Sequence, residues 1–216
     1  MFRSLAGRAA LLASLCAILP AGAQRASTDA VASAPITGIR YEITADRAAL
    51  GRRQLRVVTT FDVAGTAPVV LSLPAWTPGA YEIVNFARTV SGFGAVQGAD
   101  TLRWDKADYD SWRITPARAG QVRVSFDVTA DTLDNGMSWT RPDFALFNGT
   151  NVFLYPEGRS TEFAATVVVK TEPDFLIATG MTPAPEARTF RAASYHELVD
   201  MPLPSSPKVP LPQHLR

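Results

Sequence analysis

The stretch LSLPAWTPGAYEIVNFAR, residues 71–88, decides the fold. It begins with an apolar run typical of a strand and continues through a corner stiffened by Pro74, Pro78 and Gly79. It ends in an aromatic segment that closes on Phe86. The stretch therefore predicts a strand followed by a tight corner, with aromatic side chains packed around it.

Runs of alternating apolar and polar residues lie on both sides of this corner. Half-buried strands need this two-residue repeat, because successive side chains point to opposite faces. The runs occupy residues 39–43, 55–63, 69–73, 122–128 and 163–169, with turn clusters between them that include residues 46–51 and 92–100. Helical periodicity is weak, and only residues 194–199 are typical of a helical turn. We therefore predict an all-β fold: a β-sandwich of antiparallel strands with at most one short helical turn near the C-terminus.

The first 23 residues have the pattern of a cleaved secretory signal peptide. Arg3 and Arg8 precede an apolar run at residues 9–19 that is too short to span a bilayer. Pro20 breaks this run, and small residues then provide a cleavage site that ends at Ala23. We therefore expect a signal peptide at residues 1–23 and a periplasmic or secreted mature protein.

Composition divides the remaining chain into three segments. Residues 24–36 are small and polar, which predicts a flexible leader. Residues 37–200 carry the strand pattern and predict one β-sandwich domain. From residue 201 onward, repeated prolines remove backbone donors and favour unpaired, extended chain. We therefore predict a proline-rich tail at residues 201–216 that contributes no core strand.

Charge and cysteine content exclude several classes of partner and site. Without Arg3 and Arg8, 19 basic residues stand against 20 acidic ones, which argues against a nucleic-acid partner. Cys16 is the only cysteine and lies in the signal peptide, so the mature chain has no disulfide and no cysteine ligand. No other apolar run is long enough to span a bilayer, so we expect no membrane partner after cleavage.

Histidine, which most zinc and acyl-transfer sites require, is scarce in this chain. His214 lies in the predicted tail, and His196-Glu197-Leu198-Val199-Asp200 begins like the zincin H-E-x-x-H helix. Asp200 stands where the second imidazole should be, and Pro202 ends the helix. We therefore predict no catalytic and no metal-binding residue, and we expect this chain not to be an enzyme by itself. With catalytic and metal sites set aside, aromatic residues are the remaining candidates for binding. Our candidate contacts for a peptide or a partner are the aromatic residues Trp76 and Tyr81, together with Arg88.

Several short motifs between residues 39 and 202 share one resemblance. Leu73-Pro74-Ala75-Trp76-Thr77-Pro78-Gly79-Ala80-Tyr81 is similar to a P-x-W-x-P-G-[SA]-Y signature, and Asn85-Phe86-Ala87-Arg88 follows it. Asn148-Gly149-Thr150 and the closing segment at residues 195–202 match later parts of the same family. The chain thus resembles the N-terminal domain of the glycyl-aminopeptidase-type zinc metallopeptidases, metallopeptidase family sixty-one, whose members often carry a PDZ domain. Asn148-Gly149-Thr150 is also a formal glycosylation sequon, but such triplets often occur by chance and a turn at Asn-Gly is the default interpretation.

The resemblance implies an all-β domain that normally precedes a thermolysin-like zinc domain. In that family the metal ligands and the general base come from the second domain, which should begin shortly after Pro202. We therefore expect no cofactor in this chain, and zinc only in the missing catalytic domain. Our first hypothesis is a truncated or split product: a non-catalytic N-terminal β-domain that packs on the catalytic domain and shapes its cleft. The expected partner is that domain, if it is encoded separately.

Two other hypotheses stay open. The chain is a stand-alone secreted module that binds a peptide or a glycan through Trp76 and Tyr81, or it is an enzyme that uses His196. An adjacent reading frame encoding H-E-x-x-H would favour the first hypothesis. Ligand capture that weakens on Trp76→Ala would favour the second, and zinc that is lost on His196→Ala would favour the third.

Overall fold

Strands make up most of the regular structure in the part of the chain that the structure describes. The computed structural model describes residues 32–77, 82–133, 136 and 138–207, so the predicted signal peptide and Tyr81 lie outside it. The two α-helices of this part, α1 (Arg47–Gly51) and α2 (Tyr195–Asp200), are both short. The prediction of an all-β sandwich is confirmed. No helix of the described residues is long and apolar enough to cross a membrane.

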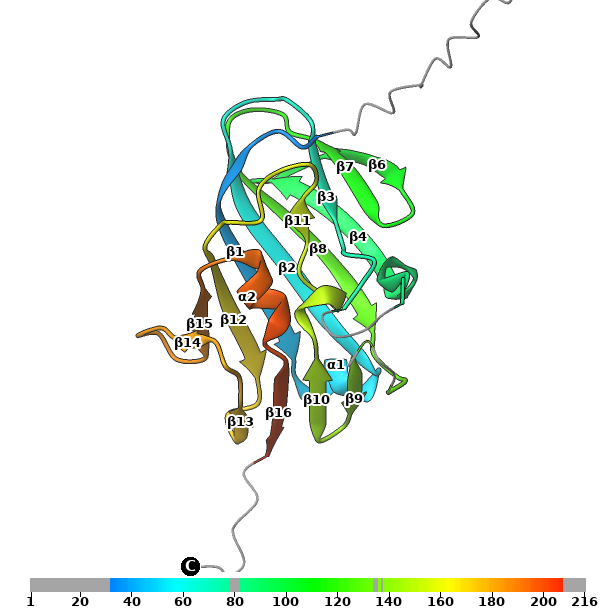
Figure 1. Ribbon diagram of the computed structural model, residues 1–216, viewed down its shortest axis with the longest axis vertical. Helices are drawn as coiled ribbons and strands as arrows, with labels where there is room; N and C mark the ends of the chain where they lie inside the picture. Colours follow the sequence, from blue (N-terminus) through cyan, green and yellow to red (C-terminus); the bar gives the residue numbers. More distant parts are fainter. Residues whose placement is uncertain (1–31, 78–81, 134–135, 137, 208–216) are drawn as a thin grey trace, which may run out of the picture. The chain divides into compact units, whose positions relative to one another are not determined.

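An eight-stranded sheet forms the back of the domain in Figure 1. Neighbouring strands are antiparallel except β1 and β12, which run parallel and depart from the predicted pattern. In sheet order the strands are β14 (Thr182–Pro183), β15 (Thr189–Ala192), β12 (Ala165–Thr171), β1 (Ile36–Ala45), β2 (Gln54–Val63), β8 (Gly120–Thr129), β4 (Val90–Gln97) and β5 (Asp100–Thr101).

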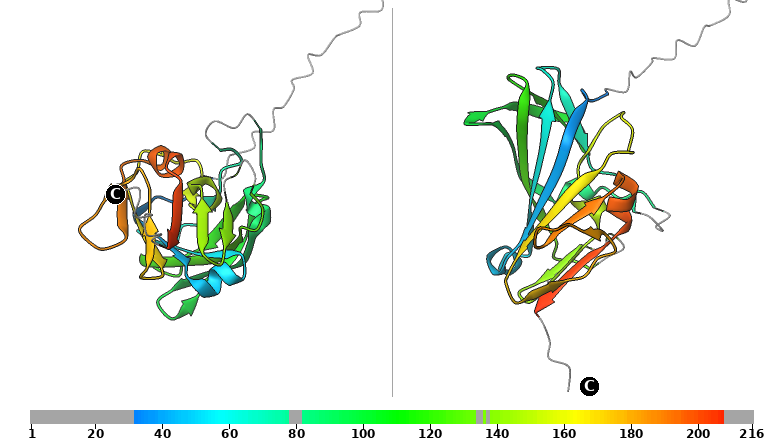
Figure 2. Two further views of the ribbon diagram at one scale, coloured as in Figure 1. Left: turned by 90° about the horizontal axis from the view of Figure 1, so that it is seen from below. Right: turned by 90° about the vertical axis from the view of Figure 1, so that its left-hand side faces the viewer.

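Two four-stranded sheets lie at opposite ends of the domain, with α2 between them (Figures 1 and 2). One contains β13 (Phe175–Ile177), β16 (Leu203–Pro207), β10 (Phe144–Phe147) and β9 (Trp139–Arg141). The other contains β11 (Tyr155–Pro156), β3 (Val69–Ser72), β7 (Ser111–Thr115) and β6 (Arg103–Asp108). Two short 3-10 helices, η1 (Phe86–Thr89) and η2 (Gly149–Asn151), lie in the connections.

One hydrophobic core joins all three sheets. The alternation seen in the sequence sets its composition, because the inward residues of β1, β2 and β8 are fully buried while their neighbours face outward. Tyr41 and Phe153 pack at the centre with ring centroids 4.7 Å apart. Burial of this aromatic and aliphatic surface is the main stabilising term of such a sandwich.

The predicted limit of one helical turn near the C-terminus needs a correction, because α1 is a second short helix. Residues 46–51 were expected to form a turn. In the structure Asp46 caps the helix by accepting a hydrogen bond from the backbone N–H of Ala49 at 2.8 Å. Leu50 is fully buried, and its packing stabilises a helix too short to be stable alone.

The glycine-rich segment at residues 92–100 is a strand for most of its length, where a turn cluster was expected. β4 pairs with β8, and a bulge between Ser91 and Gly94 interrupts the register. Gly92 has a φ of 61° at this bulge, a conformation that glycine adopts without steric cost. Glycine here permits a bulged strand. A glycine-rich composition is equally typical of a turn, so it does not distinguish the two.

The predicted leader at residues 24–36 contains part of the fold. Ile36 begins β1, and Ser33 is fully buried. The backbone N–H of Ser33 donates to the carbonyl of Glu157 at 2.8 Å, and its hydroxyl accepts from the backbone N–H of Val70 at 3.1 Å. These bonds fix a small polar segment that lacks the apolar content expected of ordered chain.

The expectation that residues from 201 onward contribute no core strand is wrong. β16 pairs with β10 on one side and with β13 on the other, and Leu203 and Ser205 are buried. The carbonyl of Pro204 accepts from the backbone N–H of Ala178, just past the end of β13. In an antiparallel strand the N–H and the C=O of one residue face the same neighbour, so the N–H that proline lacks would have faced Ala178. Ala178 lies outside β13, so no bond within the sheet is lost. Proline is therefore tolerated in this central strand.

Candidate functional site

The corner after β3 is held at both ends by backbone hydrogen bonds. Leu73 donates its N–H to the carbonyl of Asp110 at 3.0 Å, and Val84 donates to the carbonyl of Ala75 at 2.8 Å. Trp76 directly follows Ala75, and Ile83 directly precedes Val84, so they begin and end the same loop. Trp76 is 42% exposed and Ile83 is 85% exposed, so this loop presents two large apolar side chains to solvent.

A buried contact between Thr77 and Thr150 joins the corner to η2. The two hydroxyl oxygens are 3.3 Å apart, and both side chains are almost completely buried. Asn148 caps η2, because its side-chain oxygen accepts from the backbone N–H and from the hydroxyl of Thr150, each at 2.9 Å. Asn148 is only 2% exposed. Its side chain therefore stabilises the turn and is not presented as a glycosylation acceptor.

Gly149 allows α2 to lie directly on η2. A Cβ atom at this position would be 2.7 Å from the carbonyl oxygen of Leu198 and 2.9 Å from the Cα of Val199. Both of these are backbone atoms of α2 and cannot move independently of the helix. Only glycine therefore fits between the two elements.

Two buried tyrosines fix the segment that follows η2. Tyr41 donates its hydroxyl to the carbonyl of Leu154, and Tyr195 of α2 donates to the carbonyl of Phe153 at 2.7 Å. Burial raises the pKa of both phenols well above the ordinary value, which keeps them neutral and able to donate. α2 and β1 are thus attached to the same short segment.

The zincin-like residues of α2 have a structural explanation. Ser194 accepts from the backbone N–H of Glu197, and Glu197 accepts in return from the backbone N–H of Ala193 at 2.7 Å. Ser194 thus caps the helix, and Glu197 ties the first turn to the residue that precedes the cap. The Nε2 atom of His196 lies 3.1 Å from the hydroxyl of Thr161. Within the described part of the chain, no three His, Cys, Asp or Glu side chains come together as ligands for a metal ion.

Four motifs that are distant in the sequence thus converge on η2. The face they form, called here the motif face, comprises residues 73–77, 82–89, 148–151 and 195–200. The Thr77–Thr150 contact ties the corner to it, η1 packs against η2, and Gly149 seats α2. Figure 1 shows η2 in the centre of the domain beside α2.

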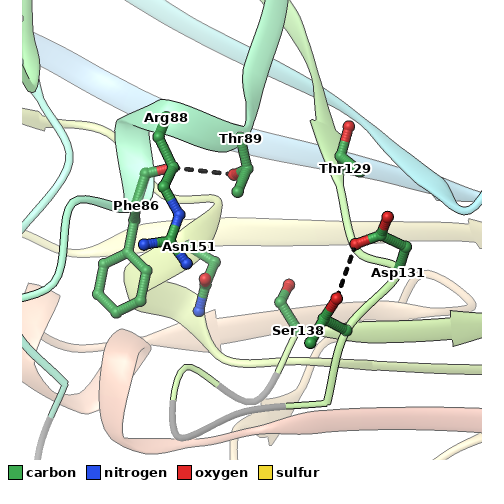
Figure 3. A pocket seen from close by; sticks show the side chains of 8 residues that line it. Phe86, Arg88, Thr89, Thr129, Asp131, Ser138 and Asn151 are labelled. Atoms are coloured by element: carbon green, nitrogen blue, oxygen red, sulfur yellow. Dashed lines mark hydrogen bonds between the residues drawn. The ribbon is translucent and has the colours of Figure 1, made fainter.

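A cavity of about 270 Å³ lies beside η1 and η2 and is lined by charged and polar side chains. Figure 3 shows Arg88 on one side, Asp131 on the other, and Ser138 and Asn151 between them. Phe86 forms an apolar wall, and Thr89, Thr129 and Thr132 complete the lining. Such a pairing of a guanidinium with a carboxylate suits a ligand that carries both charges.

A second, more open hollow of about 340 Å³ lies beside Trp76. Three residues of α2 line it with Trp76, namely His196, Glu197 and Asp200. An exposed indole next to two carboxylates suits a cationic group.

The structure places the three candidate contact residues differently. Trp76 lines the open hollow, and Arg88 lines the first cavity from η1. Tyr81 lies outside the described residues. Sequence reasoning assigned no contact role to Thr77, Ser138, Gly149 or Asn151. The Asn148-Gly149-Thr150 motif signalled the position of Gly149, but nothing in the sequence indicated which backbone would lie against it.

Two of the comparisons with known proteins returned matches. The family model of the Peptidase M61 N-terminal domain matches residues 40–206. A solved aminopeptidase N family protein from Idiomarina loihiensis is 26% identical, with a TM-score of 0.70 over 78% of this chain. An M1 zinc metallopeptidase from Deinococcus radiodurans is 14% identical, with a TM-score of 0.48 over 80% of this chain and 42% of its own. No curated protein matched the sequence. The chain spans 29% of the length of the Idiomarina protein.

Proposed function

The chain belongs to the Peptidase M61 N-terminal domain family, and from this premise we propose that it is the non-catalytic β-domain of an exported zinc metalloaminopeptidase. In this proposal the motif face packs on a catalytic domain and forms part of the wall of its substrate cleft. The signal-like pattern at residues 1–23 supports export to the periplasm or beyond.

Convergence of the family-like motifs on one face is the observation that carries this proposal. Thr77, Asn148 and Gly149 fix these motifs to one another from below, while Trp76 and Ile83 stay at the surface. The same face exposes Trp76 and Ile83. Contiguous exposed apolar patches mark surfaces that are covered in an assembly, and tryptophan is enriched among the residues that dominate binding energy.

The donor atoms present in the described residues do not fit a zinc site. His196 is the one histidine of that part of the chain, and its Nε2 atom faces Thr161. The carboxylate of Glu197 accepts a hydrogen bond from the backbone N–H of Ala193. Zinc requires three or four nitrogen, sulfur or carboxylate ligands that converge on one point. The proposal therefore assigns zinc, and the chemistry it supplies, to the catalytic domain.

The hollow beside Trp76 favours a second candidate function, a stand-alone module that binds a peptide. Glu197 and Asp200 lie next to the exposed indole and would attract a peptide amino terminus or a basic side chain. Nothing in this hollow selects a neutral glycan over such a cation. Binding of a basic peptide to the chain alone, abolished by Trp76→Ala, would favour this candidate.

We expect Ile83→Asp to weaken the complex with the M61 catalytic domain of the same organism, produced without its own N-terminal domain. The side chain of Ile83 is 85% exposed, so the substitution places a charge in the interface without disturbing the core. Analytical ultracentrifugation should show a one-to-one complex with the unaltered chain and an affinity lower by at least about 30-fold with the variant.

Leu176→Asp is the matched control for this experiment. Leu176 is 58% exposed on β13, an edge strand outside the motif face, and should leave the affinity unchanged. Equal losses from both variants, or no complex with the unaltered chain, would contradict the proposal.

A further inference from the structure

We propose that the cavity between Arg88 and Asp131 is a binding site of this chain for a small zwitterion, either a free amino acid or a dipeptide. The inference goes beyond packing on a catalytic domain, because every group that it invokes belongs to this chain. It therefore holds or fails with the chain alone in solution.

Ser138 is the feature that points to a ligand. Its side chain is buried, with 8% exposure, and its hydroxyl has no hydrogen-bond partner among the described residues. Figure 3 shows this hydroxyl directed into the cavity. A buried hydroxyl without a partner costs free energy that a bound polar group would recover.

The neighbouring hydroxyls do not share this property. Thr89 donates its hydroxyl to the carbonyl of Phe86 at 2.9 Å, and Thr132 donates to the carboxylate of Asp131 at 3.1 Å. Asn151 donates its side-chain N–H to the carbonyl of Gly136, which holds its amide at the lining. Ser138 is therefore the buried hydroxyl of this lining that lacks a partner among the described residues, and we assign to it a hydrogen bond to the ligand.

Opposite charges at the two sides define the ligand class. A guanidinium has five donors, so Arg88 can bind a carboxylate and still keep its contacts within the protein. Asp131 is positioned by the hydrogen bond from Thr132 and by a bond from the Arg53 side chain to its backbone carbonyl at 3.0 Å. The volume of about 270 Å³ lies just below the range of drug-sized sites, which limits the ligand to one or two residues.

Four related probes test this assignment in a titration followed by amide NMR shifts of the isotope-labelled chain. L-alanine and L-alanyl-L-alanine carry both charges, N-acetyl-L-alanine keeps only the carboxylate, and L-alaninamide keeps only the ammonium. We expect one or both zwitterions to shift the amides of Ser138 and Asn151, and both blocked compounds to bind about 10-fold more weakly. The better of the two zwitterions distinguishes a free amino acid from a dipeptide.

Two variants assign the roles. Ser138→Ala should weaken zwitterion binding about 10-fold without lowering the melting temperature, because this hydroxyl makes no bond in the free protein. Ser205→Ala is the matched control: this buried hydroxyl also lacks a partner but lies on β16, outside the cavity. Asp131→Asn should remove the preference for alanine over its N-acetyl form.

Three results would overturn the proposal. One is that no probe shifts these amides at concentrations of about 50 mM, well above the range of a weak specific site. Another is that N-acetyl-L-alanine binds as tightly as L-alanine, which would identify a simple anion site. The third is that Ser138→Ala and Ser205→Ala leave zwitterion affinity equally unchanged.

Discussion

Gly149→Ala is expected to lower the free energy of unfolding of this protein by about 3 kcal/mol. The added methyl group would meet the Leu198 carbonyl and the Val199 Cα at less than 3 Å, and both belong to the backbone of α2. Relief requires the whole helix to move away from η2, which also strains the Tyr195 hydrogen bond to Phe153. A thermal melt should show a decrease of about 6–12 °C for a domain of this size.

Gly51→Ala provides the matched control for that melt. Gly51 ends α1, and a Cβ atom there would meet nothing within 4 Å. The control should melt within about 2 °C of the unaltered chain, since exposed substitutions rarely change stability much. Equal melting temperatures for the two variants would show that α2 does not lie on η2 as described.

A chain that ends at Pro202 is expected to lose cooperative folding, the largest effect that we predict. It lacks β16, which pairs with strands on both sides, and it lacks the buried side chain of Leu203. Loss of a buried leucine side chain alone costs about 2–5 kcal/mol, and β10 and β13 would also lose their partner strand. The sum approaches the total stability of a typical domain. Near-ultraviolet circular dichroism should show loss of fixed tertiary packing.

The control for this truncation is a chain that ends at Pro207, which keeps β16 and every contact described here. It should melt cooperatively at a temperature close to that of the full sequence. A cooperative transition in the chain that ends at Pro202 would instead mean that β16 is dispensable.

Alternation predicted the central strands of the eight-stranded sheet and failed for β4 and β16. β1, β2 and β8 bury every second residue, so their pattern in the sequence is regular. β4 and β16 are irregular because a bulge at Gly92 and prolines that flank Leu203 interrupt them. Their pairing depends on neighbours that are distant in the sequence, and a local pattern carries no information about those neighbours.

The residues of the candidate site also fall into two groups, those that a local motif identifies and those that only the fold identifies. Trp76 and Arg88 were identified from their short motifs, and both line hollows of the surface. Thr77 and Ser138 were not, because an isolated hydroxyl residue is typical of any loop. Their importance arises from burial, which brings Thr77 against Thr150 and leaves Ser138 without a partner.

Hydrogen–deuterium exchange of the chain, alone and saturated with the M61 catalytic domain, tests the central claim most directly. If the motif face packs on that domain, amide exchange should slow at residues 73–77, 82–89 and 195–200. The hairpin of β6 and β7, which lies outside this face, should exchange at the same rate in both samples. Slowing confined to that hairpin, or to β14 and β15, with an unchanged motif face would contradict the account.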